Sequence, residues 1–232
     1  DSTTAIRFDM AASNHALFSL IVPDSALDYY VIMGPDPKTI ITRYSNLVSL
    51  PTLPPKWSFG LWMSCGFVQD TAADVLARAR SLRTHDIPCD VIHIDPYWME
   101  MGRWSDMIWN THTFPDPDGL IRELKAQNFK ICLWMNPYIG IHSPRFTEGS
   151  QKGYFLKTAH GDVWTADLWS GGHPPVAIID MTHPGAVAWF KDSLRPLLRQ
   201  GIDVFKTDFG EAVPSEVIAH NGMTGAELHN LY

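Results

Sequence analysis

The sequence predicts an α/β fold: the first half of a (β/α)8 TIM barrel, with a short β-rich region before it. From residue 59 onward, apolar runs of strand length alternate with helical patterns, and the runs are apolar on both faces. Such runs are typical of parallel strands covered by helices. No glycine-rich phosphate loop follows the first run, which favours a barrel over a doubly wound sheet. A complete barrel needs about 250 residues, so four units indicate a fragment of a longer protein.

The first 50 residues are interpreted as the end of a preceding β domain and a linker helix. Two β-rich runs at 16–22 and 27–33 are separated by a proline-containing break, and a Pro-Asp-Pro sequence opens a helix over 35–44. The proline-dense connector at 51–56 predicts a domain boundary. We therefore assign residues 1–50 to the preceding domain and residues 51–232 to a truncated barrel.

Four strands are predicted in the barrel region. They are residues 59–63, 91–95, 130–136 and 203–208. Helices are expected between them at 71–85, 120–127 and 184–200, and a further helix begins near residue 224. Thr71 is a plausible N-cap, with Asp74 in the capping-box position. The aromatic, glycine-rich stretch from 137 to 179 carries no clear periodic pattern.

Composition excludes several classes of protein. Hydrophobic residues make up 45% of the 232, and the formal net charge of −7 gives no reason to expect nucleic acid or an anionic membrane as a partner. No apolar run reaches the roughly 18 residues of a membrane span. Three widely spaced cysteines, Cys65, Cys89 and Cys132, contain no CxxC pair and indicate buried free thiols. This favours a reducing, cytoplasmic location.

The most informative segment is 205–211 (FKTDFGE), where an apolar strand ends in Lys206 and Asp208. Reacting groups of parallel barrels lie at the carboxyl ends of the strands. An aspartate beside a lysine in an apolar wall is a candidate carboxylate nucleophile. The competing interpretation is a strand-end aspartate that caps the next turn.

Polar residues end three strands, and tryptophans lie at or near the same ends. The residues are Asp95, Asn136 and Asp208, with Trp62, Trp98 and Trp134. Carboxylates can accept hydrogen bonds from sugar hydroxyls, and apolar ring faces can pack on sugar C–H groups, so a shared rim predicts a carbohydrate site. Taken singly, each residue fits a core tryptophan or a capping aspartate equally well.

Five motifs resemble glycoside hydrolase family 31, most closely its α-xylosidase branch. They are 56–62 (KWSFGLW), 93–99 (HIDPYWM), 114–117 (FPDP), 130–140 (KICLWMNPYIG) and 205–211 (FKTDFGE). They fall in the family's order and approximate spacing, and the resemblance covers about residues 40–232. It implies an N-terminal β-sandwich followed by a (β/α)8 barrel and a retaining glycosidase without cofactor or metal. The implied partner is an oligosaccharide or glycoside, and a homo-oligomer is compatible with it.

The resemblance also implies roles for single residues. It places the nucleophile, which forms a glycosyl ester, on Asp208 and hydroxyl binding on Lys206 and Asp95. Trp134 and Phe67 match aromatic walls of the same subsite, and Trp98 is grouped with them as a substrate-binding residue. Retaining chemistry requires a second carboxyl group about 5–5.5 Å away.

The family's acid/base aspartate lies on a later segment and is expected outside this chain. Glu211 is not a substitute, since it is expected to enter the loop, and Asp180 and Asp203 are interpreted as structural. We therefore expect the isolated 232-residue chain to be inactive.

Specificity rests on the pair that follows the strand-two aspartate. In the α-xylosidase-like members an aromatic residue there fills the space of the glucose C6 hydroxymethyl group. Here Tyr97 follows Pro96, so release of terminal α-linked xylose is favoured, with an α-glucosidase as the alternative.

Three other functions compete. Lys206 could form a Schiff base in an aldolase, but a nearby carboxylate raises its pKa rather than lowering it. His93 and Asp95 could supply two ligands of a metal-dependent hydrolase. A truncated relative could bind sugar without cleaving it, because the second carboxylate is missing.

Overall fold

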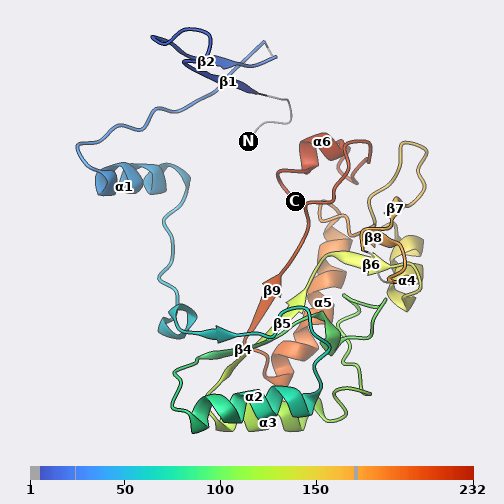
Figure 1. Cartoon of the computed structure of the whole chain (residues 1–232). Coiled ribbons are helices and arrows are strands. Elements are labelled where there is room, and N and C mark those ends of the chain that lie inside the picture. The colour runs from blue at the N-terminus through green and yellow to red at the C-terminus, as the bar shows by residue number, and fades with distance from the viewer. Residues whose placement is uncertain (1–5, 24, 170–171) are drawn as a thin grey trace. The chain divides into compact units, whose positions relative to one another are not determined.

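The computed structural model describes residues 6–23, 25–169 and 172–232, which form two compact units. The boundary between the units falls between Pro55 and Lys56 in the sequence. The elements of both units are labelled in Figure 1.

The first unit contains an antiparallel hairpin and one helix. Strands β1 (Arg7–Met10) and β2 (Phe18–Ile21) form the hairpin, and α1 spans Pro37–Val48. The Asp36 carboxylate accepts from the Thr39 backbone N–H at 3.0 Å and caps the helix. The predicted strand at 27–33 is wrong. None of the described strands pairs with this segment, so its backbone lacks the ladder hydrogen bonds of a strand.

The second unit is built on a four-stranded parallel sheet, as predicted. Its strands, in spatial order, are β3 (Trp62–Met63), β4 (Val91–Ile94), β5 (Lys130–Met135) and β9 (Val204–Thr207). The first strand is shorter than the predicted 59–63, because Lys56–Phe59 form a 3-10 turn, η1. The Gly60 N–H closes that turn on the Trp57 carbonyl at 3.2 Å.

Helices α2 (Ala72–Thr84), α3 (Pro117–Ala126) and α5 (Pro184–Gln200) connect these strands. Helices α2 and α3 lie side by side along the sheet (Figure 1). The predicted capping box is confirmed: Thr71 Oγ1 accepts from the Asp74 N–H at 3.3 Å, and the Asp74 carboxylate accepts from the Thr71 N–H at 2.9 Å. No helix in the described part of the chain is long and apolar enough to cross a membrane.

The stretch from 137 to 179 contains a small antiparallel sheet that the sequence analysis missed. The strands of this sheet are β6 (Tyr138–Gly140), β7 (Thr165–Ala166) and β8 (Val176–Ile178), and helix α4 (Pro144–Lys152) lies between β6 and β7 in the sequence. Two- and three-residue strands are too short to show alternation, which needs about four residues or more. Near the end of the chain, the predicted helix from 224 is the short α6 (Gly225–Leu228).

The register of the parallel sheet places the strand-end residues beside one another. Ile94 pairs with Leu133, and Trp134 pairs with Lys206. Asp95, Trp134 and Lys206 therefore lie on three neighbouring strands at the same carboxyl edge. This edge is where a parallel barrel presents its reacting groups.

Candidate active site

A cavity of about 600 Å³ opens at the carboxyl edge of the sheet. It is lined by Phe67, Asp95, Pro96, Tyr97, Met101, Trp104, Trp134, Trp169, Asp208 and Phe209. Five of the site residues predicted from the sequence line this cavity: Phe67, Asp95, Tyr97, Trp134 and Asp208.

Asp208 follows the last residue of β9 and turns toward the cavity. Its N–H donates to the Met135 carbonyl at 2.9 Å, which extends the sheet by one residue. Phe209 (φ 60°) and Gly210 (φ 121°) then adopt left-handed conformations. This sharp turn ends the strand directly after the carboxylate and presents Asp208 at the rim.

Two side chains contact the Asp208 carboxylate. Trp134 Nε1 donates to Oδ2 at 2.7 Å, and Lys206 Nζ lies 3.2 Å from the same oxygen. Burial by itself would raise the pKa of Asp208, but these hydrogen bonds and the Lys206 charge lower it below its ordinary value. Asp208 is therefore ionised at neutral pH, as a carboxylate nucleophile must be.

Asp95 has a different environment on the other side of Lys206. Its side chain is 11% exposed, and Lys206 Nζ lies 3.7 Å from Oδ1. Burial raises the pKa of Asp95, while Lys206 opposes this effect. The Lys206 ammonium thus lies near two carboxylates, and their pKa values are shifted in opposite directions. Two carboxylates with opposite pKa shifts in one site typically have different roles in the chemistry.

An aromatic wall closes the cavity, and Trp104 lies at its centre. The Trp104 ring contacts the rings of four other cavity residues at centroid distances of 5.5 to 5.8 Å. They are Phe67, Tyr97, Trp134 and Trp169. Sequence reasoning missed Trp104, Trp169, Met101 and Phe209. Only Phe209 adjoins a predicted strand end, and the first three follow no periodic pattern.

Trp98 does not line the cavity, so its assignment to substrate binding is corrected. Its side chain is fully buried, and its indole N–H donates to the Trp134 carbonyl at 2.9 Å. The ring packs against Trp109 at 5.0 Å. Trp98 therefore supports the strand that carries Trp134, because residues 96–98 form a 3-10 turn, η2 (Pro96–Trp98), that directs the indole inward.

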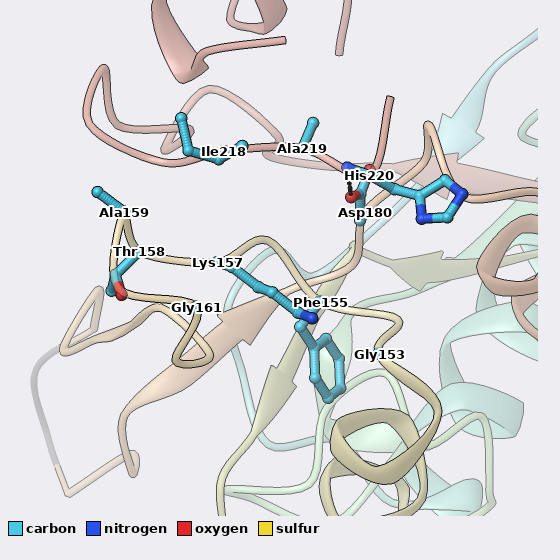
Figure 2. A pocket seen from close by; sticks show the side chains of 10 residues that line it. All are labelled: Gly153, Phe155, Lys157, Thr158, Ala159, Gly161, Asp180, Ile218, Ala219 and His220. Atoms are coloured by element: carbon cyan, nitrogen blue, oxygen red, sulfur yellow. Dashed lines mark hydrogen bonds between the residues drawn. The ribbon is translucent and has the colours of Figure 1, made fainter. Parts of the chain in front are cut away.

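Other carboxylates predicted to be structural are engaged elsewhere. Asp203 Oδ2 accepts from the Ile131 N–H at 2.8 Å and pairs with Lys125. Asp180 lines a second hollow of about 330 Å³, drawn in Figure 2, where its carboxylate accepts from the His220 N–H. Two rings line that hollow among the described residues, the His220 imidazole and the Phe155 ring, and Phe155 is 1% exposed. The Phe155 ring therefore offers no exposed face on which a sugar could stack.

Among residues 6–23, 25–169 and 172–232, no three His, Cys, Asp or Glu side chains are grouped so as to hold a metal ion. The expectation that no metal or cofactor takes part stays a prediction.

Replacing Trp134 by phenylalanine should lower kcat/KM about 10- to 100-fold in the full-length protein. The change keeps an aromatic ring but removes the hydrogen bond to Asp208, and such bonds to charged groups contribute about 1.5–3 kcal/mol. The pKa of Asp208 should rise with it. Trp189→Phe is the matched control, because it removes an indole hydrogen bond to Glu148 outside the cavity. Equal kinetics for the two variants would contradict the role assigned to Trp134.

Comparison with known proteins identifies relatives over the whole described chain. The family profile "Glycosyl hydrolases family 31 TIM-barrel domain" matches residues 51–232. The chain is 39% identical to the α-xylosidase XylQ of Lactiplantibacillus pentosus and 35% identical to an α-xylosidase of Emericella nidulans. These matches cover 100% and 98% of this chain.

The chain spans about 30% of the length of these relatives. Among solved structures, a variant of the GH31 dextranase of Flavobacterium johnsoniae complexed with isomaltotriose superposes with a TM-score of 0.85. It is 25% identical, and the match covers 97% of this chain and 28% of the dextranase chain. The half-barrel architecture is thus shared with enzymes several times longer.

Proposed function

Since the chain belongs to glycoside hydrolase family 31, we propose that the protein containing it is a retaining α-glycosidase that releases terminal α-linked xylose. The observation that carries this proposal is the Asp208 carboxylate, held ionised by Trp134 and Lys206 inside an aromatic cavity. The names of the two relatives that are 39% and 35% identical support the substrate class.

In the proposed first step, an Asp208 oxygen attacks the anomeric carbon and the bond to the leaving group breaks, which gives a glycosyl ester. Asp95 and Lys206 would bind sugar hydroxyls on the far side of the ring. Water then attacks the ester and restores the configuration at the anomeric carbon. Two displacements at one carbon give net retention.

The second carboxyl group of this mechanism is proposed to come from a part of the protein outside this sequence. Asp95 and Asp208 are the two carboxylates among the described residues that line the cavity. The Lys206 ammonium lies 3.7 Å from Asp95 Oδ1, which supports a role for Asp95 in binding hydroxyls rather than in protonating a leaving group.

We also assign the first 50 residues to the end of a β-sandwich domain. The hairpin exposes apolar side chains that a larger domain would cover: Phe8 is 60% exposed and Phe18 is 63% exposed. A two-stranded hairpin alone is marginally stable in water.

The preference for xylose is attributed to the aromatic contact between Phe67 and Tyr97, whose ring centroids are 5.0 Å apart. Tyr97 is the middle residue of η2 and lines the cavity together with Asp95. A hydroxymethyl group on the sugar would compete with these rings for space. An α-glucosidase of the same family is the alternative.

Replacing Tyr97 by alanine should shift the ratio of kcat/KM for α-glucoside over α-xyloside by about 10- to 100-fold toward glucoside. A pocket that excludes one small group contributes about 1–3 kcal/mol to specificity. Tyr97→Phe keeps the ring and should leave the ratio within about threefold. An unchanged ratio in Tyr97→Ala would contradict the assignment.

The proposed function is tested on the full-length gene product with 4-nitrophenyl α-D-xyloside and α-D-glucoside. Proton NMR of the released sugar, recorded before mutarotation mixes the anomers, should show the α anomer. A first-formed β anomer would exclude retention, and no turnover of either glycoside would exclude the hydrolase.

A further inference from the structure

A buried histidine lies directly beneath Asp95. Alternate residues of a strand face the same side of a sheet, so His93 on β4 and Asp95 just beyond it face the same interior. Their side chains are 7% and 11% exposed. Both also line an inner hollow of about 550 Å³ together with Lys206 and Cys132. His93 is thus in the layer immediately below the candidate active site.

One ring nitrogen of His93 is engaged by the neighbouring strand. Met63 pairs with Ile92, which brings Ser64 beside His93, and Ser64 Oγ lies 2.8 Å from His93 Nδ1. The same hydroxyl oxygen accepts from the Gly66 N–H at 3.0 Å. The Ser64 oxygen keeps a second lone pair, so this contact alone fits either tautomer of the imidazole. The Asp95 carboxylate that faces Nε2 favours the proton on Nε2, and Nδ1 then accepts from the Ser64 hydroxyl.

The other nitrogen faces Asp95. A neutral imidazole with an accepting Nδ1 carries its proton on Nε2, and Nε2 lies 3.5 Å from Asp95 Oδ1. In the described part of the chain, both atoms are buried and neither has a hydrogen-bond partner. Hydrogen bonds in unliganded active sites are often long and shorten when substrate binds. The donor Nε2–H and the acceptor Oδ1 are therefore suited to form a hydrogen bond with each other.

Burial and the charge of Lys206 keep the imidazole neutral. Burial lowers the pKa of His93 to about 4, and Lys206 acts in the same direction while Asp208 opposes it. Burial also raises the pKa of Asp95, so a donor facing Oδ1 would favour the ionised carboxylate. The titratable groups that face Asp95 are His93, Tyr97, Cys132, Lys206, Asp208 and Asp70.

We propose that Ser64 and His93 form a hydrogen-bonded relay that orients Asp95 and holds it ionised for binding sugar hydroxyls. His93 acts on the substrate only through Asp95 and is therefore a positioning residue. The proposal rests on the proposed function insofar as Asp95 binds the sugar. The competing role is structural: an imidazole that merely fills the barrel interior.

The test compares His93→Phe with His93→Gln in the full-length protein. The phenylalanine fills the space without a donor, whereas the glutamine amide can place an N–H near the position of Nε2. We expect His93→Phe to lower kcat/KM for 4-nitrophenyl α-xyloside about 10- to 100-fold, mainly through KM. His93→Gln should recover to within about fivefold of wild type.

The pH profile separates positioning from packing. Loss of the Nε2–H donor raises the pKa of Asp95, so Asp95 becomes protonated at a higher pH. The acidic limb of the kcat/KM profile should therefore move to higher pH in His93→Phe and stay near the wild-type position in His93→Gln. An unmoved limb in His93→Phe, or equal losses in both variants, would overturn the relay.

Two further measurements keep the outcomes distinct. Binding of D-xylose is measured by tryptophan fluorescence. If the wild-type protein binds D-xylose but hydrolyses neither glycoside, the proposed hydrolase function is refuted. Weaker D-xylose binding by His93→Phe than by wild type would then still support the relay, and equal binding would overturn it. If circular dichroism shows that His93→Phe does not fold, the Ser64→Ala variant tests the relay instead. It should lower kcat/KM about 3- to 10-fold with the same shift of the acidic limb, and wild-type kinetics would overturn the relay.

Discussion

Replacing Asp208 by asparagine in the full-length protein should lower kcat/KM for an aryl α-xyloside by about 10⁴-fold or more. The amide has the size of the carboxylate and can still accept the Trp134 hydrogen bond. It cannot form the glycosyl ester, so the pathway through the covalent intermediate is lost. Steady-state assays with circular dichroism of both proteins measure this directly.

Asp192→Asn is the matched control for that substitution. Asp192 lies on α5, its side chain is 68% exposed, and its described ion pair is with the nearby Arg195. The same chemical change there should leave kcat/KM within about twofold, since exposed ion pairs contribute little. Activity of Asp208→Asn within threefold of wild type would remove Asp208 from the mechanism.

Rescue by azide makes the Asp208 prediction more specific. In Asp208→Gly the small anion can occupy the space of the missing carboxylate and attack the anomeric carbon of a substrate with an activated leaving group. The product should be the β-glycosyl azide, because attack comes from the side opposite the α-linked leaving group. Formation of the α-azide, or no azide adduct at any concentration, would place the nucleophile elsewhere.

Replacing Lys206 by methionine should have the second largest effect, a loss of about 10²- to 10³-fold in kcat/KM. The ammonium lies 3.2 Å from Asp208 and 3.7 Å from Asp95, so its removal leaves two carboxylates facing each other. Like charges that close disfavour double ionisation. The methionine preserves the length of the side chain and therefore isolates the charge.

The pH dependence of the Lys206 variant has a definite sign. Lys206 lowers the pKa of Asp208 and opposes the rise at Asp95, so both pKa values increase when it is removed. The acidic limb of kcat/KM should therefore move to higher pH. Lys206→Arg keeps the charge and should shift the limb less. Lys191→Met, at an exposed site on α5, is the control and should leave both the limb and the rate unchanged.

Local signals in the sequence predicted the regular elements well. The capping box of Thr71 and Asp74 and the span of α5 depend on residues three or four apart, and both match the structure. The segment 27–33 has similar β composition to β2 yet forms no strand, because pairing depends on a partner rather than on the segment's own residues. The short strands β6, β7 and β8 were missed because their pairing is non-local.

Some features of the candidate site also follow from the local sequence, whereas others depend on how distant segments pack. Lys206 and Asp208 are two residues apart on one strand, so their common orientation follows from the alternation of side chains. Trp98 and Trp134 carry equal weight in the sequence, but only Trp134 reaches the cavity, because η2 buries Trp98 beneath β5. Trp104 comes to the centre of the aromatic wall from a loop whose path no periodicity records.

The family, the parallel strands and the identities of the two cavity aspartates can therefore be read from the chain, because they reside in local patterns and in motifs. The contacts that set their chemistry cannot. The hydrogen bond from Trp134 to Asp208, the approach of Lys206 to Asp95 and the contact of Ser64 with His93 join different strands. They depend on strand register and burial, and these exist only when segments distant in sequence pack together.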